Sequence, residues 1–157
     1  MDLCKDRGRR LFGHPLHPAL VHFPVALLSI SLLWDITGMM VNGPFWPRMS
    51  LWCIIAGLVT ALPAAATGMS DYVLIGNKHP GLHTATTHMI VMFGALSFYT
   101  ASLFFRLRIT VSSRHAMLVP ILLSLPGFVL ILIGGWLGGE LVLRYGIGTT
   151  AGRDDEE

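Results

Sequence analysis

The sequence predicts an all-α, polytopic membrane protein whose four transmembrane helices form an up-down bundle. Three observations predict this fold class. Hydrophobic residues make up 53% of the 157 residues, and the mean hydropathy is +0.63. Charged residues make up 13%, roughly half of the about 25% that is usual in soluble domains. The apolar residues also gather into four runs, each near the roughly 20 residues that a helix needs to cross the hydrocarbon core.

The four runs divide the chain into three parts. We expect a basic N-terminal tail with an HPxHP motif over 1–18, a transmembrane domain over 19–143 and a polar, acidic C-terminal tail over 144–157. The expected spans are Ala19–Val41, Met49–Met69, Ala85–Phe105 and Met117–Leu143. Of the 11 basic and 9 acidic residues, only Asp35 and Glu140 fall inside a span. The gaps are short and rich in turn residues, so consecutive helices should pack as antiparallel neighbours.

The distribution of basic residues predicts the orientation in the membrane. Seven lie on the side of the two termini and four on the other side, which favours cytoplasmic termini in a multi-pass protein of the bacterial cytoplasmic membrane. The first run is too long for a signal peptide and contains Asp35, so we expect it to be retained. No basic cluster alternates with aromatic residues, which argues against a nucleic-acid partner. Cys4 and Cys53 fall near opposite faces of the bilayer, where they cannot form a disulfide with each other.

Six of the seven histidines gather on one side of the predicted bundle. His14 and His17 precede the first span and His22 is its fourth residue, while His79 and His83 precede the third span and His88 is its fourth residue. The second span ends on this same side, two residues before Asp71. The fourth span also ends there and contains Glu140. Because buried ionisable groups in a membrane are costly, this layer is a candidate site. The candidate ligands are His14, His17, His22, Asp71, His83, His88 and Glu140.

Two kinds of cofactor suit a layer of histidines and carboxylates. His22 and His88, on separate helices at one depth, could hold the iron of a single haem b from its two sides. The same histidines with Asp71 and Glu140 could instead bind a non-haem transition metal such as zinc or iron. The third reading is a structural or assembly subunit without cofactor, whose polar layer only holds the helices together. The chain has no HExxH motif, nucleophile elbow or phosphate-binding glycine loop, so whether it is an enzyme stays open.

Other patterns favour ordinary helix packing. The stripe Met92, Ala95, Tyr99 and Ser102 follows His88 at helical spacing. Small residues recur four apart, in Gly57-xxx-Ala61-xxx-Ala65, Gly134-xxx-Gly138 and Gly135-xxx-Gly139, which favours close helix approach and leaves a homo-oligomer open. Asp35 lies near the opposite membrane face, where we expect it to pair with Arg106 or Arg108.

Several motifs resemble the DUF2231 family of predicted bacterial membrane proteins. The first is the string His14-Pro15-Leu16-His17-Pro18-Ala19-Leu20-Val21-His22-Phe23-Pro24-Val25. The others are Gly68-x-x-Asp71-Tyr72, His88, Gly138-Gly139-x-Leu141-Val142 and Tyr145-Gly146-x-Gly148. The resemblance covers nearly the whole chain and implies a protein of similar size with four helices. Relatives fused to Rieske-type iron–sulfur domains imply a place near membrane electron transfer, and hence a separate redox partner protein for this chain.

These observations favour a one-haem, b-type membrane redox protein with His22 and His88 as axial ligands. The expected partners are the lipid bilayer and a redox protein. A metal-binding or metal-transport bundle, and a structural subunit, remain the alternatives.

Overall fold

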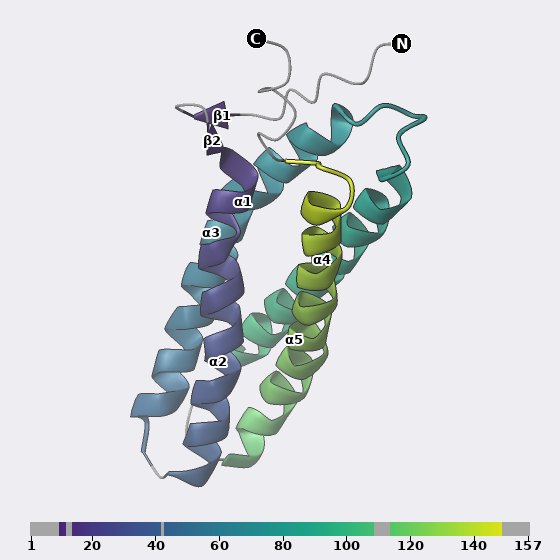
Figure 1. Cartoon of the computed structure of the whole chain (residues 1–157). Helices are drawn as coiled ribbons and strands as arrows, with labels where there is room; N and C mark the ends of the chain where they lie inside the picture. Colours follow the sequence, from purple (N-terminus) through teal and green to yellow (C-terminus); the bar gives the residue numbers. More distant parts are fainter. Residues whose placement is uncertain (1–9, 12–13, 42, 109–113, 149–157) are drawn as a thin grey trace.

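The computed structural model describes residues 10–11, 14–41, 43–108 and 114–148. Its five helices are α1 (Leu16–Leu20), α2 (His22–Met40), α3 (Phe45–Val73), α4 (Leu82–Arg108) and α5 (Arg114–Leu143). A short antiparallel pair, β1 (Arg10–Leu11) with β2 (His14–Pro15), precedes α1 (Figure 1). Four helical segments within this part of the chain are long and apolar enough to cross a membrane: Leu16–Met40, Phe45–Val73, Leu82–Arg108 and Met117–Leu143. The predicted fold class is confirmed.

The helices extend beyond the predicted spans by three or four residues at several ends, and the N-terminal extension matters most. The first span begins at Leu16 rather than Ala19, because proline is tolerated in the first turn of a helix. Pro18, Pro24 and Pro47 are each the third residue of their helix, where the missing N–H leaves no intrahelical bond unmade. Val21 lies between α1 and α2, and its N–H donates to the His17 carbonyl at 3.1 Å. His17 therefore belongs to the first span and not to the tail.

The bundle consists of two helical hairpins. α2 packs along α3, and α4 packs along α5, whereas the contacts between the hairpins are fewer (Figure 1). Small residues allow the close approach, since a Cβ on Gly57 would lie 2.7 Å from Leu28 Cδ2 and one on Gly134 would collide with Met92 Sδ. A Cβ on Gly135 or Gly139 would meet no atom of the described chain within 4 Å. The first two small-residue motifs thus serve packing within the protomer, as predicted.

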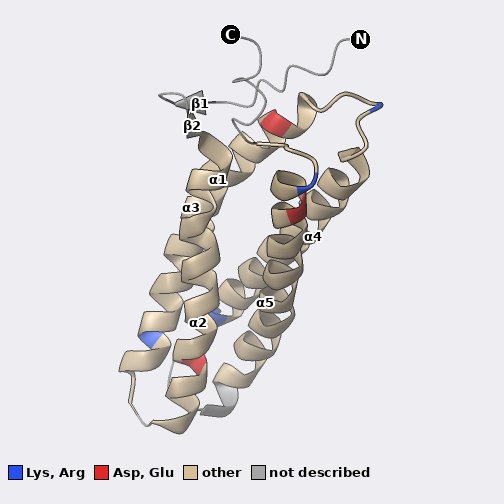
Figure 2. Ribbon diagram, in the orientation of Figure 1, with Lys and Arg blue, Asp and Glu red and all other residues tan. Residues whose placement is uncertain are grey.

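The middle of the bundle is apolar and its charges lie toward the two ends (Figure 2). Leu28, Ile54, Ala95, Tyr99 and Ile131 form the central core cluster. Many large apolar side chains instead point outward; Leu62 is 70% and Trp136 is 78% exposed. In a soluble protein such a surface would be costly, but lipid tails cover it in a membrane.

Asp35 pairs with Arg106, as the sequence predicted. The guanidinium NH1 and NH2 groups donate to the two carboxylate oxygens at 2.9 and 2.6 Å, and both side chains are buried. Arg106 lies within α4 rather than in a loop, so the pair is a buried bond between the two hairpins.

Candidate functional site

A cavity of about 280 Å³ lies between the two hairpins, in the half of the bundle that carries α1. Its walls are almost entirely apolar, and all five helices contribute to them. Along α4 the lining residues run from Ala85 through His88 to Leu96, and the helix rises about 12 Å from His88 to Leu96 alone. The floor is formed by Leu28, Ala95 and Ile131 of the central core cluster.

His17 enters the cavity wall from α1. Its Nδ1 lies 2.8 Å from the Ala64 carbonyl oxygen of α3. The ring also lies against Gly68, where a Cβ would approach the His17 Cε1 to 2.6 Å. Only glycine at position 68 leaves room for this ring position, which gives the glycine of the Gly68-x-x-Asp71-Tyr72 motif a physical reason.

His88 enters the wall from α4 in an equivalent way. Its Nδ1 lies 2.9 Å from the Gly134 carbonyl oxygen of α5, and a Cβ on Gly138 would approach the His88 Cε1 to 3.3 Å. A carbonyl oxygen only accepts hydrogen bonds, so Nδ1 of both histidines carries the proton and donates. In the neutral form of such a ring Nε2 keeps its lone pair, and an Nδ1–H bound to a carbonyl is the arrangement that metal-ligating histidines usually show.

His17 and His88 lie at the same depth on helices that run in parallel. Two hydrogen bonds fix the register between the first and third spans: Tyr99 bonds to Leu28, and Arg106 to Asp35, each across 71 residues of sequence. His17 and His88 are also 71 residues apart. The long side chains of Tyr99 and Arg106 each cross the space between the first and third spans. At the level of the two histidines, the cavity occupies this space instead.

The structure does not bring His22 to the cavity, where the sequence analysis expected it. His22 is exposed, and its Nδ1 lies 3.3 Å from the Ala19 carbonyl oxygen of the preceding turn. The reason is helix geometry: five residues rotate a side chain by about 140°, so His17 and His22 cannot face the same way. Since α1 already includes His17, that residue and not His22 lies opposite His88.

Asp71 also lines the cavity, but Glu140 and His83 do not. Glu140 accepts a hydrogen bond from Arg144 at 2.8 Å, which raises the pKa of the exposed Arg144 guanidinium. His83 is exposed, and the side chain of His14 lies outside the described part of the structure. Among the described residues no three His, Cys, Asp or Glu side chains are grouped so as to hold a metal ion. The geometry therefore gives no support to a non-haem metal site built from this layer.

The segment after α5 covers the mouth of the cavity, which the sequence analysis did not foresee. Gly146 and Gly148 have φ angles of 65° and 78°, a conformation that favours glycine, and they turn the chain back over the helix end. The Ile147 N–H donates to the Leu141 carbonyl at 3.0 Å, and Ile147 and Gly148 line the cavity. A Cβ on Gly81 would lie 2.9 Å from both Tyr145 and Ile147. The glycine-rich motif Tyr145-Gly146-x-Gly148 thus builds one wall of the site.

Comparison with known proteins identifies a family. The sequence profile of the family described as "Predicted membrane protein (DUF2231)" matches residues 13–151, and the chain belongs to this family. No curated protein and no solved structure matches the chain. The motifs by which the chain resembles the family contribute Gly68, Asp71, His88, Gly138 and Gly148 to the surroundings of the cavity.

Proposed function

We propose that this DUF2231 protein is a b-type membrane redox protein that binds one haem in the cavity, where His17 and His88 would hold its iron. One observation carries the proposal. Two imidazoles from opposite hairpins line one apolar cavity at the same depth, and each has its Nδ1–H held by a helix carbonyl. This geometry favours His17 over His22 as the partner of His88.

The cavity suits a flat apolar group in several respects. Its volume of about 280 Å³ lies just below the roughly 300–1,000 Å³ of ligand pockets, so a bound haem would require the hairpins to move apart slightly. Glycines at 68 and 138 accommodate the two imidazole rings against the wall, and the remaining wall is largely Ala, Val, Leu, Ile and Met. Haem would supply one-electron transfer through its iron. The protein's part is to hold two imidazoles in fixed orientation and to exclude water from the site.

Absorbance spectra of the purified protein test the proposal. Wild-type protein, expressed with haem supply and purified in detergent, should show a Soret band that sharpens on reduction, with one haem per chain. His17→Ala and His88→Ala should each lose most of that haem. His22→Ala is the matched control because His22 is exposed and close in sequence, so it should retain full haem content. A wild-type protein without haem, or a loss of haem in His22→Ala but not in His17→Ala, would refute the assignment.

We infer that the cavity end faces the cytoplasm of a bacterial cell and meets the redox partner there. The seven-to-four distribution of basic residues supports this orientation. Gly148, the last described residue, lines the cavity, and β1 with Arg10 lies at the same end of the bundle (Figure 1), so a phosphatase or fluorescent reporter fused to the C-terminus tests which side this end faces. Fluorescence without phosphatase activity is expected; periplasmic phosphatase activity would reverse the orientation.

A further inference from the structure

The cavity reaches the outer surface of the bundle at Gly135 of α5. Gly135 lines the cavity and is itself exposed, and a Cβ at this position would meet no atom of the described chain within 4 Å. Among the described residues that line the cavity, Met69 of α3 and Phe93 of α4 are also exposed. Both of these have large side chains that form the wall, whereas Gly135 has none. The wall is therefore open at Gly135.

The opening lies on the side of α5 that faces the first span. Gly134 and Gly138 pack on α4, against Met92 and His88. Gly135 is rotated by about 100° from Gly134. Within the cavity wall it therefore lies toward α2, the helix that α5 contacts most after α4.

Gly135 faces the hydrocarbon layer of the membrane and not water. The fourth span ends at Leu143, so the rise of the helix places Gly135 about 12 Å inside this end. The headgroup layer takes up only roughly 5–8 Å at each face of a bilayer. Leu132, one helical turn away, and the neighbouring Trp136 are exposed apolar side chains that lipid tails cover. The opening therefore leads into the bilayer.

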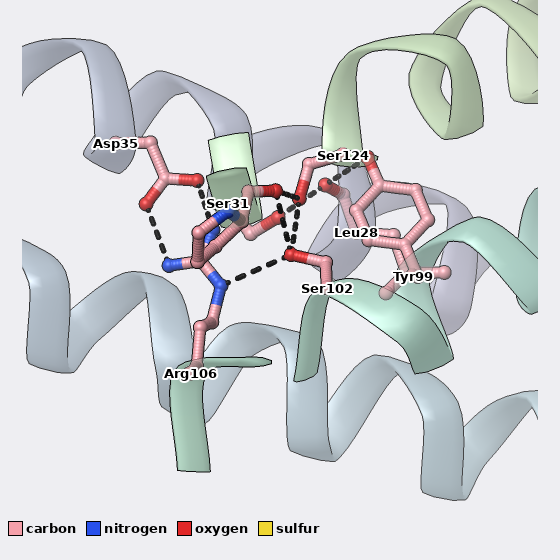
Figure 3. Close-up of polar contacts among 8 residues, drawn as sticks. Leu28, Ser31, Asp35, Tyr99, Ser102, Arg106 and Ser124 are labelled. Carbon is pink, nitrogen blue, oxygen red and sulfur yellow. Dashed lines mark hydrogen bonds and ion pairs between the residues drawn. The ribbon is translucent and has the colours of Figure 1, made fainter. Parts of the chain in front are cut away.

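The two hairpins are joined by buried polar contacts beyond the floor of the cavity (Figure 3). There Arg106 of α4 binds Asp35 of α2 through two hydrogen bonds. The Tyr99 hydroxyl of α4 donates to the Leu28 carbonyl of α2 at 2.9 Å. These bonds fix α2 and α4 to each other in the half of the bundle away from the cavity.

At the cavity end the hairpins are joined on the side of α3 and α4. A hydrogen bond of 3.0 Å links the hydroxyls of Tyr72 and Thr86 there. On the other side α5 scarcely contacts α1, which packs on α3, and the two stand apart (Figure 1). A small outward movement of the end of α5 therefore widens the opening at Gly135 while the bonds elsewhere stay in place.

We propose that the cavity takes up its ligand from the hydrocarbon layer of the membrane, through the opening at Gly135 between α5 and the first span. This inference rests on the proposed function and names the phase from which the haem comes. Tyr145, Ile147 and Gly148 cover the aqueous mouth, so a ligand from water would have to displace this segment. The haem ring is broad and apolar and dissolves in lipid, and the walls that receive it are apolar as well.

The rate of haem uptake from lipid tests this route. The full chain is reconstituted without haem in vesicles, a second population of vesicles supplies haemin, and the rise of the Soret band reports uptake. Gly135→Leu places a branched side chain in the opening and should slow uptake at least tenfold. Because one opening serves entry and exit, release of haem to acceptor vesicles should slow by the same factor, and the haem content at equilibrium should stay unchanged. Gly135→Ala should slow both rates less than Gly135→Leu.

Gly139→Leu is the matched control. A Cβ on Gly139, one turn further along α5, also meets open space, but Gly139 is not among the described residues that line the cavity. This variant should take up haem at the wild-type rate. Equal uptake rates in Gly135→Leu and Gly139→Leu would overturn the route and leave the haem site standing.

Protoporphyrin without iron separates the route from the haem site, because it has no metal for the histidines to bind. Its uptake, followed by fluorescence polarisation, should show the same dependence on the side chain at position 135. That result would support the route even if haem were not held by His17 and His88. Wild-type protein that takes up neither haem nor protoporphyrin would refute both proposals.

Discussion

Removal of one partner of the buried ion pair should destabilise the bundle far more than removal of both. Arg106→Met leaves the Asp35 carboxylate at 2% exposure without the two donors that it has now. Each hydrogen bond to a charged group contributes about 1.5–3 kcal/mol, so two of them amount to about 3–6 kcal/mol. Measured losses for one partner of a buried pair, about 3–5 kcal/mol, fall within the same range. We therefore expect Arg106→Met to lower the free energy of unfolding by about 3–5 kcal/mol.

The double variant Asp35→Leu/Arg106→Met separates this cause from general disruption of the helices. With both charges gone no unpaired ion remains, so most of the stability should return. The assay is reversible unfolding in mixed detergent micelles with increasing SDS, followed by circular dichroism, and a double-mutant cycle gives the coupling energy. Arg144→Met removes an arginine from the exposed Glu140–Arg144 pair and should leave the unfolding curve unchanged. If the double variant is as unstable as Arg106→Met, the loss comes from packing and not from the charge.

Three further variants test the packing around the cavity and the core. Gly68→Ala places a Cβ 2.6 Å from the His17 ring, so it should displace the ring and destabilise the protein by about 1–3 kcal/mol. The control Gly139→Ala places its Cβ in open space and should not destabilise the protein. Equal unfolding curves for the two variants would refute the position of His17. Tyr99→Phe should lower the free energy of unfolding by about 1 kcal/mol in the same assay, because the Leu28 carbonyl keeps its hydrogen bond from Ser31. A loss near that of Arg106→Met would mean that the aromatic ring has moved. Gly81→Val should push Tyr145 and Ile147 off the cavity mouth and speed proteolysis after α5, and unchanged cleavage would show that the segment does not pack there.

The fold could be predicted from the sequence because the membrane imposes one strong rule. A spanning segment must be long, apolar and helical, and four segments met that rule. The same rule identified Asp35 as an exception within a span, and its pairing with Arg106 followed from the cost of a buried charge. These inferences need only hydropathy and topology, which a sequence carries directly.

The candidate site could be predicted only in part, because it depends on where a helix begins. Hydropathy placed the start of the first span at Ala19, since His17 and Pro18 look like tail residues. The structure continues the helix back to Leu16, and this moves His17 into the wall and leaves His22 outside it. The available signal was the proline at position 18, which is allowed in a first helical turn. The glycine-rich segment over the cavity mouth depends on two positive φ angles that no apolar pattern reveals.

The spin state of the iron tests the pairing of His17 with His88 most directly. Electron paramagnetic resonance of the oxidised, haem-loaded protein should show low-spin iron in wild type and in His22→Ala, because two imidazoles bind the metal. His17→Ala protein that still holds haem should turn high-spin, and added imidazole should restore the low-spin signal. A low-spin signal that survives in His17→Ala and is lost in His22→Ala would contradict the account.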